Sequence, residues 1–107
     1  MSDRRVLVVD DEKDIHRALR LILEKEGFEV GTAETAREAL ERLKTGSFEV
    51  VISDFRLPDF DGLELLRMVK LQHPQVEFIL LTGYGTIDIA VQAIREGAYD
   101  FVQKPVK

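Results

Sequence analysis

Two adjacent aspartates, Asp10 and Asp11, stand directly after a short apolar run in the segment LVVDDEKD at residues 7–14. A chain that turns at the end of a strand accommodates one aspartate easily, because the carboxylate bonds to nearby backbone N–H groups. Two neighbouring carboxylates repel each other, so the pair needs positive charge close by. Taken alone, the pair is most simply explained as a helix-capping pair.

Three further polar residues, Asp54, Thr82 and Lys104, also come directly after apolar runs. In a parallel sheet the carboxyl ends of all strands lie along one edge, which is where ligands of such folds bind. If the runs are parallel strands, carboxylates, a hydroxyl and an ammonium group would therefore meet at that edge. Each residue alone has an ordinary structural explanation, and only the set indicates a functional site.

A divalent cation with a preference for oxygen ligands would compensate the three carboxylates. Mg²⁺ uses one or two protein carboxylates, keeps several waters and shares its other positions with phosphate oxygens. One carboxylate could then act as a nucleophile towards phosphorus, as in aspartyl-phosphate chemistry. Thr82 could donate to one phosphoryl oxygen, and Lys104 could pair with another. The residue types therefore predict phosphoryl transfer to an aspartate, with Mg²⁺ as the cofactor.

Strand and helix patterns alternate along the chain and would position these residues. Predicted strands occupy residues 6–9, 28–33, 48–53, 76–81 and 98–103. Residues 6–9 and 48–53 show the apolar pattern of strands buried on both faces, and residues 98–103 are less apolar. Helical spacing of apolar residues lies between them, and Gly27, Gly46, Pro74 and Gly97 end the four predicted helices. This alternation predicts a doubly wound α/β fold with a parallel sheet.

The composition predicts one globular domain over residues 1–107, with a formal net charge of -5. No clustered basic face is visible, which argues against direct binding to nucleic acid. The sequence has no cysteine, which excludes a disulfide framework and a thiolate metal site. No apolar stretch approaches the roughly 18 residues that a membrane span needs. We therefore expect a cytoplasmic protein with no membrane or nucleic-acid partner.

Four motifs resemble the receiver domain of two-component response regulators: VVDDE at 8–12, SDFRLPDFDG at 53–62, LTGYG at 81–85 and QKP at 103–105. The resemblance covers essentially the whole chain in order and spacing. The segment from residue 82 to residue 105 looks most like receivers of enhancer-binding transcriptional activators, which carry ATPase and DNA-binding domains after the receiver. The resemblance implies a flavodoxin-like sheet of five parallel strands in the order 2-1-3-4-5.

The resemblance also assigns roles to the acidic residues. Asp54 would be the phosphoacceptor and would also contact the Mg²⁺ ion. Asp11 would bind Mg²⁺ directly, Asp10 would bind it through water, and the backbone carbonyl of Arg56 would complete the ligands that the protein supplies.

The remaining family roles fall on Thr82, Lys104 and Phe101. Thr82 and Lys104 would contact the phosphoryl group, and Phe101 occupies the position of an aromatic switch residue that changes rotamer as the threonine moves. The phosphoryl donor would be a sensor histidine kinase or a phosphotransfer protein, and the receiver would catalyse its own phosphorylation and dephosphorylation. Phosphorylation would change the surface of the fourth helix and fifth strand, and thereby control an output domain or oligomerisation.

Receivers normally continue with a fifth helix after the Lys-Pro pair, whereas this sequence ends at Lys107. We therefore expect a C-terminally truncated receiver over residues 1–107, with four helices present and apolar surface exposed near the fifth strand. Such a surface would lead to a homodimer, to exchange of elements between chains, or to low stability.

Two other functions stay open. A Mg²⁺-dependent phosphatase of similar layout also uses a strand-end aspartate, but such enzymes usually place a second aspartate where this chain has Arg56. An unphosphorylated protein-interaction module would keep only the fold. Among the remaining residues, Arg56 and Tyr84 are expected to set the lifetime of the phosphoaspartate. His16 and His73 lack a second ligand at metal spacing and are expected at the surface.

Overall fold

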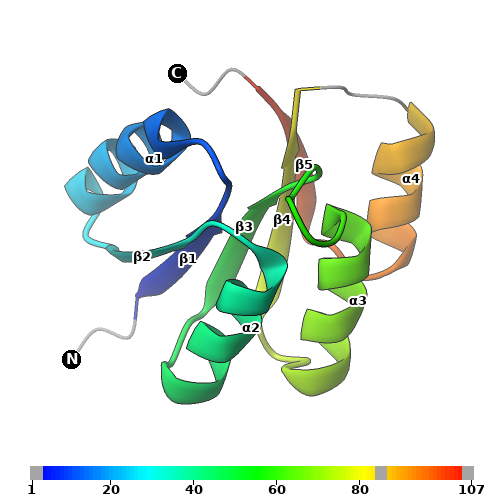
Figure 1. Ribbon diagram of the computed structural model, residues 1–107, viewed down its shortest axis with the longest axis horizontal. Coiled ribbons are helices and arrows are strands. Elements are labelled where there is room, and N and C mark those ends of the chain that lie inside the picture. The colour runs from blue at the N-terminus through cyan, green and yellow to red at the C-terminus, as the bar shows by residue number, and fades with distance from the viewer. Residues whose placement is uncertain (1–3, 84–86, 105–107) are drawn as a thin grey trace.

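The computed structural model describes residues 4–83 and 87–104, and it contains five parallel strands in the order β2-β1-β3-β4-β5 (Figure 1). The strands are β1 (Arg5–Val9), β2 (Glu29–Ala33), β3 (Val50–Asp54), β4 (Glu77–Thr82) and β5 (Asp100–Gln103). The helices are α1 (Lys13–Lys25), α2 (Ala36–Thr45), α3 (Gly62–Gln72) and α4 (Ile87–Arg95). The predicted doubly wound fold and its strand order are confirmed. Tyr84 and Pro105, which belong to two of the motifs, lie outside the described residues.

Four strands begin one or two residues later than the apolar runs predicted. Phe28, Phe48, Val76 and Ala98 open those runs, but each lies before its strand. Phe48, Val76 and Ala98 are nevertheless buried and belong to the core cluster on one face of the sheet. These residues are therefore apolar because they are buried, and not because they belong to a strand. An apolar sequence pattern alone does not distinguish a buried loop residue from a strand residue.

The helices cover the two faces of the sheet unequally (Figure 1). One face packs against α2, α3 and α4, and its core includes Leu7 and Val9 of β1. The opposite face packs against α1, and its core includes Val6 and Val8 of the same strand. Successive side chains of a strand point to opposite faces, so a run with no polar residue supplies both cores.

Near β5, helices cover the sheet face that packs against α1 less completely than they cover the opposite face. Its buried members are Val6, Val8, Leu19 and Leu81, whereas Ile52 is only partly buried. Val102 on β5 is 41% exposed. Apolar surface is thus exposed beside the fifth strand, and the dimerisation expected from it stays a prediction.

Glycine ends α1 and α4 in the way the sequence predicts. Gly27 and Gly97 have φ values of 93° and 106°, which an L side chain rarely adopts. The chain turns at each of these residues towards the next strand. Within the described part of the chain, no helix has the length and apolar character needed to cross a membrane.

Candidate functional site

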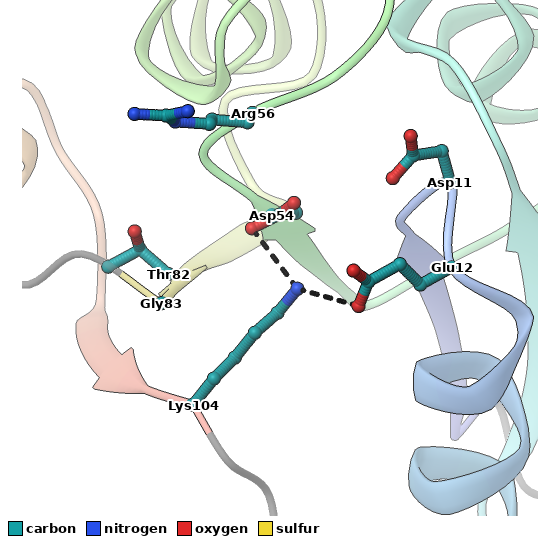
Figure 2. A pocket seen from close by; sticks show the side chains of 7 residues that line it. All are labelled: Asp11, Glu12, Asp54, Arg56, Thr82, Gly83 and Lys104. Carbon is teal, nitrogen blue, oxygen red and sulfur yellow. Dashed lines mark hydrogen bonds and ion pairs between the residues drawn. The ribbon is translucent and has the colours of Figure 1, made fainter.

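The carboxyl ends of four strands bring the predicted residues to one edge of the sheet. Asp54 and Thr82 are the last residues of β3 and β4, and Lys104 directly follows β5. They surround a cavity of about 260 Å³ (Figure 2). Its lining consists of Asp11, Glu12, Asp54, Arg56, Thr82, Gly83 and Lys104. The strand-end residues Asp54, Thr82 and Lys104 therefore lie around one cavity, and the roles expected for them stay predictions.

Three carboxylates converge at this edge. Asp10, Asp11 and Asp54 each place one oxygen within 4.8 Å of the oxygens of the other two. Asp10 is 0% exposed and Asp54 is 7% exposed, whereas Asp11 is open to solvent. Two of the three negative charges are therefore largely removed from water, and their mutual repulsion is screened less than at a surface.

Asp10 is held by contacts that leave one of its oxygens facing the site. Its backbone N–H donates to the carbonyl of Ala33 at 3.0 Å, and its Oδ1 accepts from the backbone N–H of Glu12 at 2.9 Å. Its Oδ2 is buried and has no hydrogen-bond partner among the described residues. A buried carboxylate oxygen without a hydrogen bond needs a cation or a water beside it, and here the ammonium group of Lys104 lies 3.1 Å away.

Lys104 places its ammonium group among the acids. Its Nζ lies 3.1 Å from Asp10 Oδ2, 3.4 Å from Glu12 Oε1 and 3.5 Å from Asp54 Oδ1. The contact with Asp10 has the distance of an ion pair but not the alignment of a hydrogen bond. Figure 2 shows the side chain extending from β5 between Asp54 and Glu12. One cation is thus shared by three carboxylates.

The charges of this cluster change the pKa values of two of its members. Burial raises the pKa of Asp54 and the negative charge of Asp10 raises it further, while Lys104 opposes both without cancelling them. Burial of Lys104 by itself lowers the pKa of the ammonium, but the contact with Asp10 and the charges of Asp54 and Glu12 outweigh it and raise that pKa. The cluster therefore lacks positive charge even with Lys104 in place.

The residues present fit a Mg²⁺ ion. Asp10, Asp11 and Asp54 offer three carboxylate oxygens within 4.8 Å of one another, and carboxylate oxygen is the ligand type that Mg²⁺ prefers. A bound cation would also favour the ionised form of Asp54, which burial disfavours. Asp10, Asp11 and Asp54 are therefore the residues that would hold the ion.

Arg56, Thr82 and Phe101 lie around this centre. Arg56 forms an isolated antiparallel bridge with Asp61, which fixes its backbone beside the cavity, and its side chain extends away from Asp11 (Figure 2). Thr82 is 1% exposed. Phe101 is partly buried and packs against the core on the face of α3 and α4. It is paired with Leu80 in the β4–β5 ladder, two residues before Thr82.

The prediction that His16 lies at the surface is wrong. His16 is 9% exposed, and its Nε2 lies 2.7 Å from the backbone carbonyl oxygen of Asp10. His73 is partly buried, and its Nε2 has no hydrogen-bond partner in the described part of the chain. The helical spacing of His16 with the buried Leu19 places both on the inner face of α1 and was the signal available in the sequence.

Two acids that contribute to the site region were not predicted from the sequence. Glu12 lines the cavity and pairs with Lys104. Asp59, in the loop that follows β3, accepts hydrogen bonds from the backbone N–H groups of Ala36 and Arg37, both at 2.9 Å. These contacts join segments far apart in the sequence, so local patterns carry no signal for them.

Comparison with known proteins gives a family match over nearly the whole chain. The model of the response regulator receiver domain matches residues 6–107. The response regulator protein PilR of Pseudomonas aeruginosa is 40% identical over 106 residues, which are 99% of this chain and 24% of that protein. The C4-dicarboxylate transport transcriptional regulatory protein DctD of Rhizobium meliloti is 45% identical over 100 residues, which are 94% of this chain and 22% of that protein. The chain thus spans about a quarter or less of these relatives.

Solved structures with the same fold include several receiver domains. The beryllofluoride-activated NtrC4 receiver domain dimer has a TM-score of 0.92 and 44% identity, covering 97% of this chain and 86% of that one. A response regulator protein from Burkholderia pseudomallei, solved with a phosphorylated aspartic acid, a calcium ion and citrate, has a TM-score of 0.89 and 33% identity. That match covers 97% of this chain and 61% of the other.

Proposed function

We propose, from the premise that this chain belongs to the response regulator receiver family, that it accepts a phosphoryl group on Asp54 with Mg²⁺ bound beside it. The observation that carries the proposal is the convergence of three strand-end carboxylates within 4.8 Å of one another, with Lys104 between them. The phosphorylated aspartic acid and calcium ion of the Burkholderia pseudomallei regulator support it, since that protein shares the fold.

The transfer step needs a nucleophile, a leaving group and compensation of charge. An oxygen of Asp54 forms a bond to phosphorus while the bond from phosphorus to a histidine nitrogen of the donor breaks, and the electron pair leaves with that nitrogen. Mg²⁺, when bound, neutralises charge on the transferring group and on the acids. The hydroxyl of Thr82 would donate a hydrogen bond to one phosphoryl oxygen. The ammonium group of Lys104 would give up part of its contact with the acids and pair with a second phosphoryl oxygen.

The donor that fits this chemistry is a partner histidine kinase or a phosphotransfer protein, which would present its phosphohistidine in the cytoplasm. The receiver would supply the catalytic groups for its own phosphorylation and hydrolysis, so it is not an enzyme that acts on a separate pool of substrate. Arg56, and Tyr84 outside the described residues, would govern the access of water to the phosphoaspartate and hence its lifetime.

The output of the switch would be the surface of α4 and β5. Phosphorylation adds nearly two negative charges, which would draw Thr82 and Lys104 inward and shift Phe101 between two packings. Exposed apolar side chains of α4 are Ile87, Val91 and Ile94, Tyr99 is exposed just before β5, and Val102 of β5 is exposed on the opposite face of the sheet. A surface of this kind fits a protein partner, either a second receiver or the output domain of an enhancer-binding activator.

Incubation of the protein with Mg²⁺ and acetyl phosphate, followed by mass spectrometry, tests the proposal. We expect one phosphoryl group per chain, no labelling of Asp54→Asn, and normal labelling of Asp88→Asn, a matched variant of an exposed acid on α4. Rapid turnover of many phosphate esters would instead support a phosphatase. Absence of labelling in the native protein would support an interaction module and overturn the proposal.

A further inference from the structure

A buried imidazole holds the loop between β1 and α1, and the proposed transfer does not use it. His16 lies in the first turn of α1, with Nε2 at 2.7 Å from the backbone carbonyl oxygen of Asp10. A carbonyl oxygen only accepts hydrogen bonds, so Nε2 carries the hydrogen. The bond runs from the helix back to the end of the strand and crosses the segment that bears the acidic pair.

This bond completes the set of contacts that hold Asp10. The backbone N–H of Asp10 donates to Ala33, its Oδ1 accepts from the N–H of Glu12, and its carbonyl accepts from His16. With these groups occupied, Oδ2 is the oxygen of Asp10 that is left for the acidic cluster, where it is buried and lies 3.1 Å from the ammonium group of Lys104. The network therefore selects which oxygen faces the cation.

The same carbonyl belongs to the peptide group that joins Asp10 to Asp11. Because a peptide group is planar, a hydrogen bond that fixes the direction of its carbonyl also fixes the orientation of the whole peptide plane. That plane sets the direction of the Asp11 backbone after the end of β1. The hydrogen bond of His16 therefore acts on the backbone between the two carboxylates. Mg²⁺ demands near-ideal octahedral geometry, so an acidic pair placed in advance binds it more tightly than a mobile pair.

We propose that His16 is a positioning residue for the metal site, acting through the backbone of the acidic pair. The inference rests on the proposed function, because it presumes that the acids bind Mg²⁺. His16 touches neither the ion nor the phosphoryl group, and its role is to supply a hydrogen-bond donor at a fixed place. Residues that orient metal ligands in this way typically contribute about tenfold or more to metal affinity.

Titration of the native protein and of His16 variants with Mg²⁺ tests the inference, with binding followed by calorimetry and by the amide NMR shift of Asp11. His16→Phe keeps an aromatic ring but removes the donor, and we expect its affinity for Mg²⁺ to fall about tenfold. His16→Gln can place an amide donor near the former Nε2 position and should recover most of that loss. The shorter His16→Asn cannot reach the carbonyl and should not.

Leu19→Ala is the control for a general loss of packing, because Leu19 is buried on the same helix and face. It should lower the melting temperature while the Mg²⁺ affinity stays within about twofold of the native value. Equal affinities of the native protein and His16→Phe would overturn the inference. If His16→Phe does not fold, equal affinities of His16→Gln and His16→Asn would overturn it as well. Absence of Mg²⁺ binding by the native protein would overturn the proposed function itself.

Discussion

Asp54 destabilises the metal-free fold at neutral pH because its carboxylate is buried beside another acid. Its raised pKa means that the fold favours the protonated form, through burial first and the charge of Asp10 second. The stability contributed by protonated Asp54 is present below the ordinary pKa of an aspartate and is lost as the pH rises through the raised pKa. Asp54, the proposed phosphoacceptor, therefore lowers the stability of the metal-free fold, as is common for residues of functional sites.

Replacement of Asp54 by asparagine should stabilise the metal-free protein at neutral pH, because the amide carries no charge to bury. We expect the melting temperature of Asp54→Asn in chelator to exceed that of the native protein by a few degrees. Mg²⁺ should raise the melting temperature of the native protein and raise that of Asp54→Asn less. Thermal unfolding with chelator and with Mg²⁺ measures both effects, and a less stable Asp54→Asn in chelator would contradict this account.

At the level of elements, α2 depends on a residue outside itself. Thr35 accepts from the N–H of Glu38 as a local N-cap, while the carboxylate of Asp59 accepts from the N–H groups of Ala36 and Arg37. Burial by itself raises the pKa of Asp59, but these backbone hydrogen bonds outweigh it and hold that pKa below its usual range. The loop that carries Arg56 is thereby attached to the N-terminus of α2.

Asp59→Ala should lower the free energy of unfolding by about 1 kcal/mol at neutral pH, since it removes the bonds to two helix-terminal N–H groups. The contribution of Asp59 is present above the ordinary pKa of an aspartate and is lost as the pH falls through its lowered pKa. Urea unfolding at neutral and acidic pH should therefore show the difference from the native protein shrinking in acid.

Asp14→Ala is the control for the loss of an exposed acid near a helix N-terminus that accepts no hydrogen bond from that helix's backbone among the contacts described. The carboxylate of Asp14 pairs with exposed Arg17 at 3.3 Å, so its removal should change the free energy of unfolding by less than about 0.5 kcal/mol. A pH-independent difference between Asp59→Ala and the native protein would show that the hydrogen bonds to α2 do not depend on the charge of Asp59.

The start of α3 lies so close to the end of β3 that only glycine fits. A Cβ added to Gly62 would lie 2.7 Å from Leu80 Cδ1 and 2.8 Å from the backbone oxygen of Asp54. Alanine normally favours a helix over glycine by up to about 1 kcal/mol. The close approach of backbone to backbone reverses this preference at Gly62, and the same contact positions the residue that would accept phosphorus.

Gly62→Ala should destabilise the protein by about 1–3 kcal/mol, because the strand end and the helix must move apart to admit the methyl group. Chemical unfolding measures the change, and phosphorylation by acetyl phosphate should slow in the folded fraction as Asp54 shifts. Gly83→Ala is the control for stability, since nothing lies within 4 Å of its added Cβ. A stabilised Gly62→Ala would show that the contact relaxes without cost.

At the scale of the whole molecule, two exposed apolar areas, one on α4 and one beside β5, are candidates for contact with other chains. Ala90, Val91 and Ile94 line an apolar groove along α4, and Val91 and Ile94 are 42% and 50% exposed. Val102 on β5 adds exposed apolar surface on the other face of the sheet. Exposed apolar areas of this kind mark contacts with other chains, so we expect self-association through the groove on α4.

Ile94→Lys should weaken self-association without changing phosphorylation, because it places a charge in the apolar groove and lies away from the acidic cluster. We expect beryllofluoride with Mg²⁺ to shift the native protein towards a dimer in analytical ultracentrifugation, and to shift Ile94→Lys much less. Leu71→Lys is the matched control, since Leu71 is an 82% exposed leucine on α3. An equal loss of dimer in both variants would show that α4 is not the interface.

The order of the elements and the set of residues at the strand ends could be predicted from the sequence. Apolar runs such as Val6 to Val9 and the helical spacing around Leu19 report local backbone preference and burial together. Because parallel strands share one direction, the residues that follow them must meet at one edge, so Asp54, Thr82 and Lys104 could be placed in a single site before any contact was known.

Only the tertiary structure decided which groups face one another. The burial of His16 against the Asp10 carbonyl, the cap that Asp59 provides for α2 and the sharing of Lys104 among three acids all join segments separated by turns of the chain. Such contacts depend on how helices pack on the sheet, and that packing is determined by the sum of many weak long-range interactions. Local sequence periodicity records which side of an element is buried, but not the partner that the buried group meets.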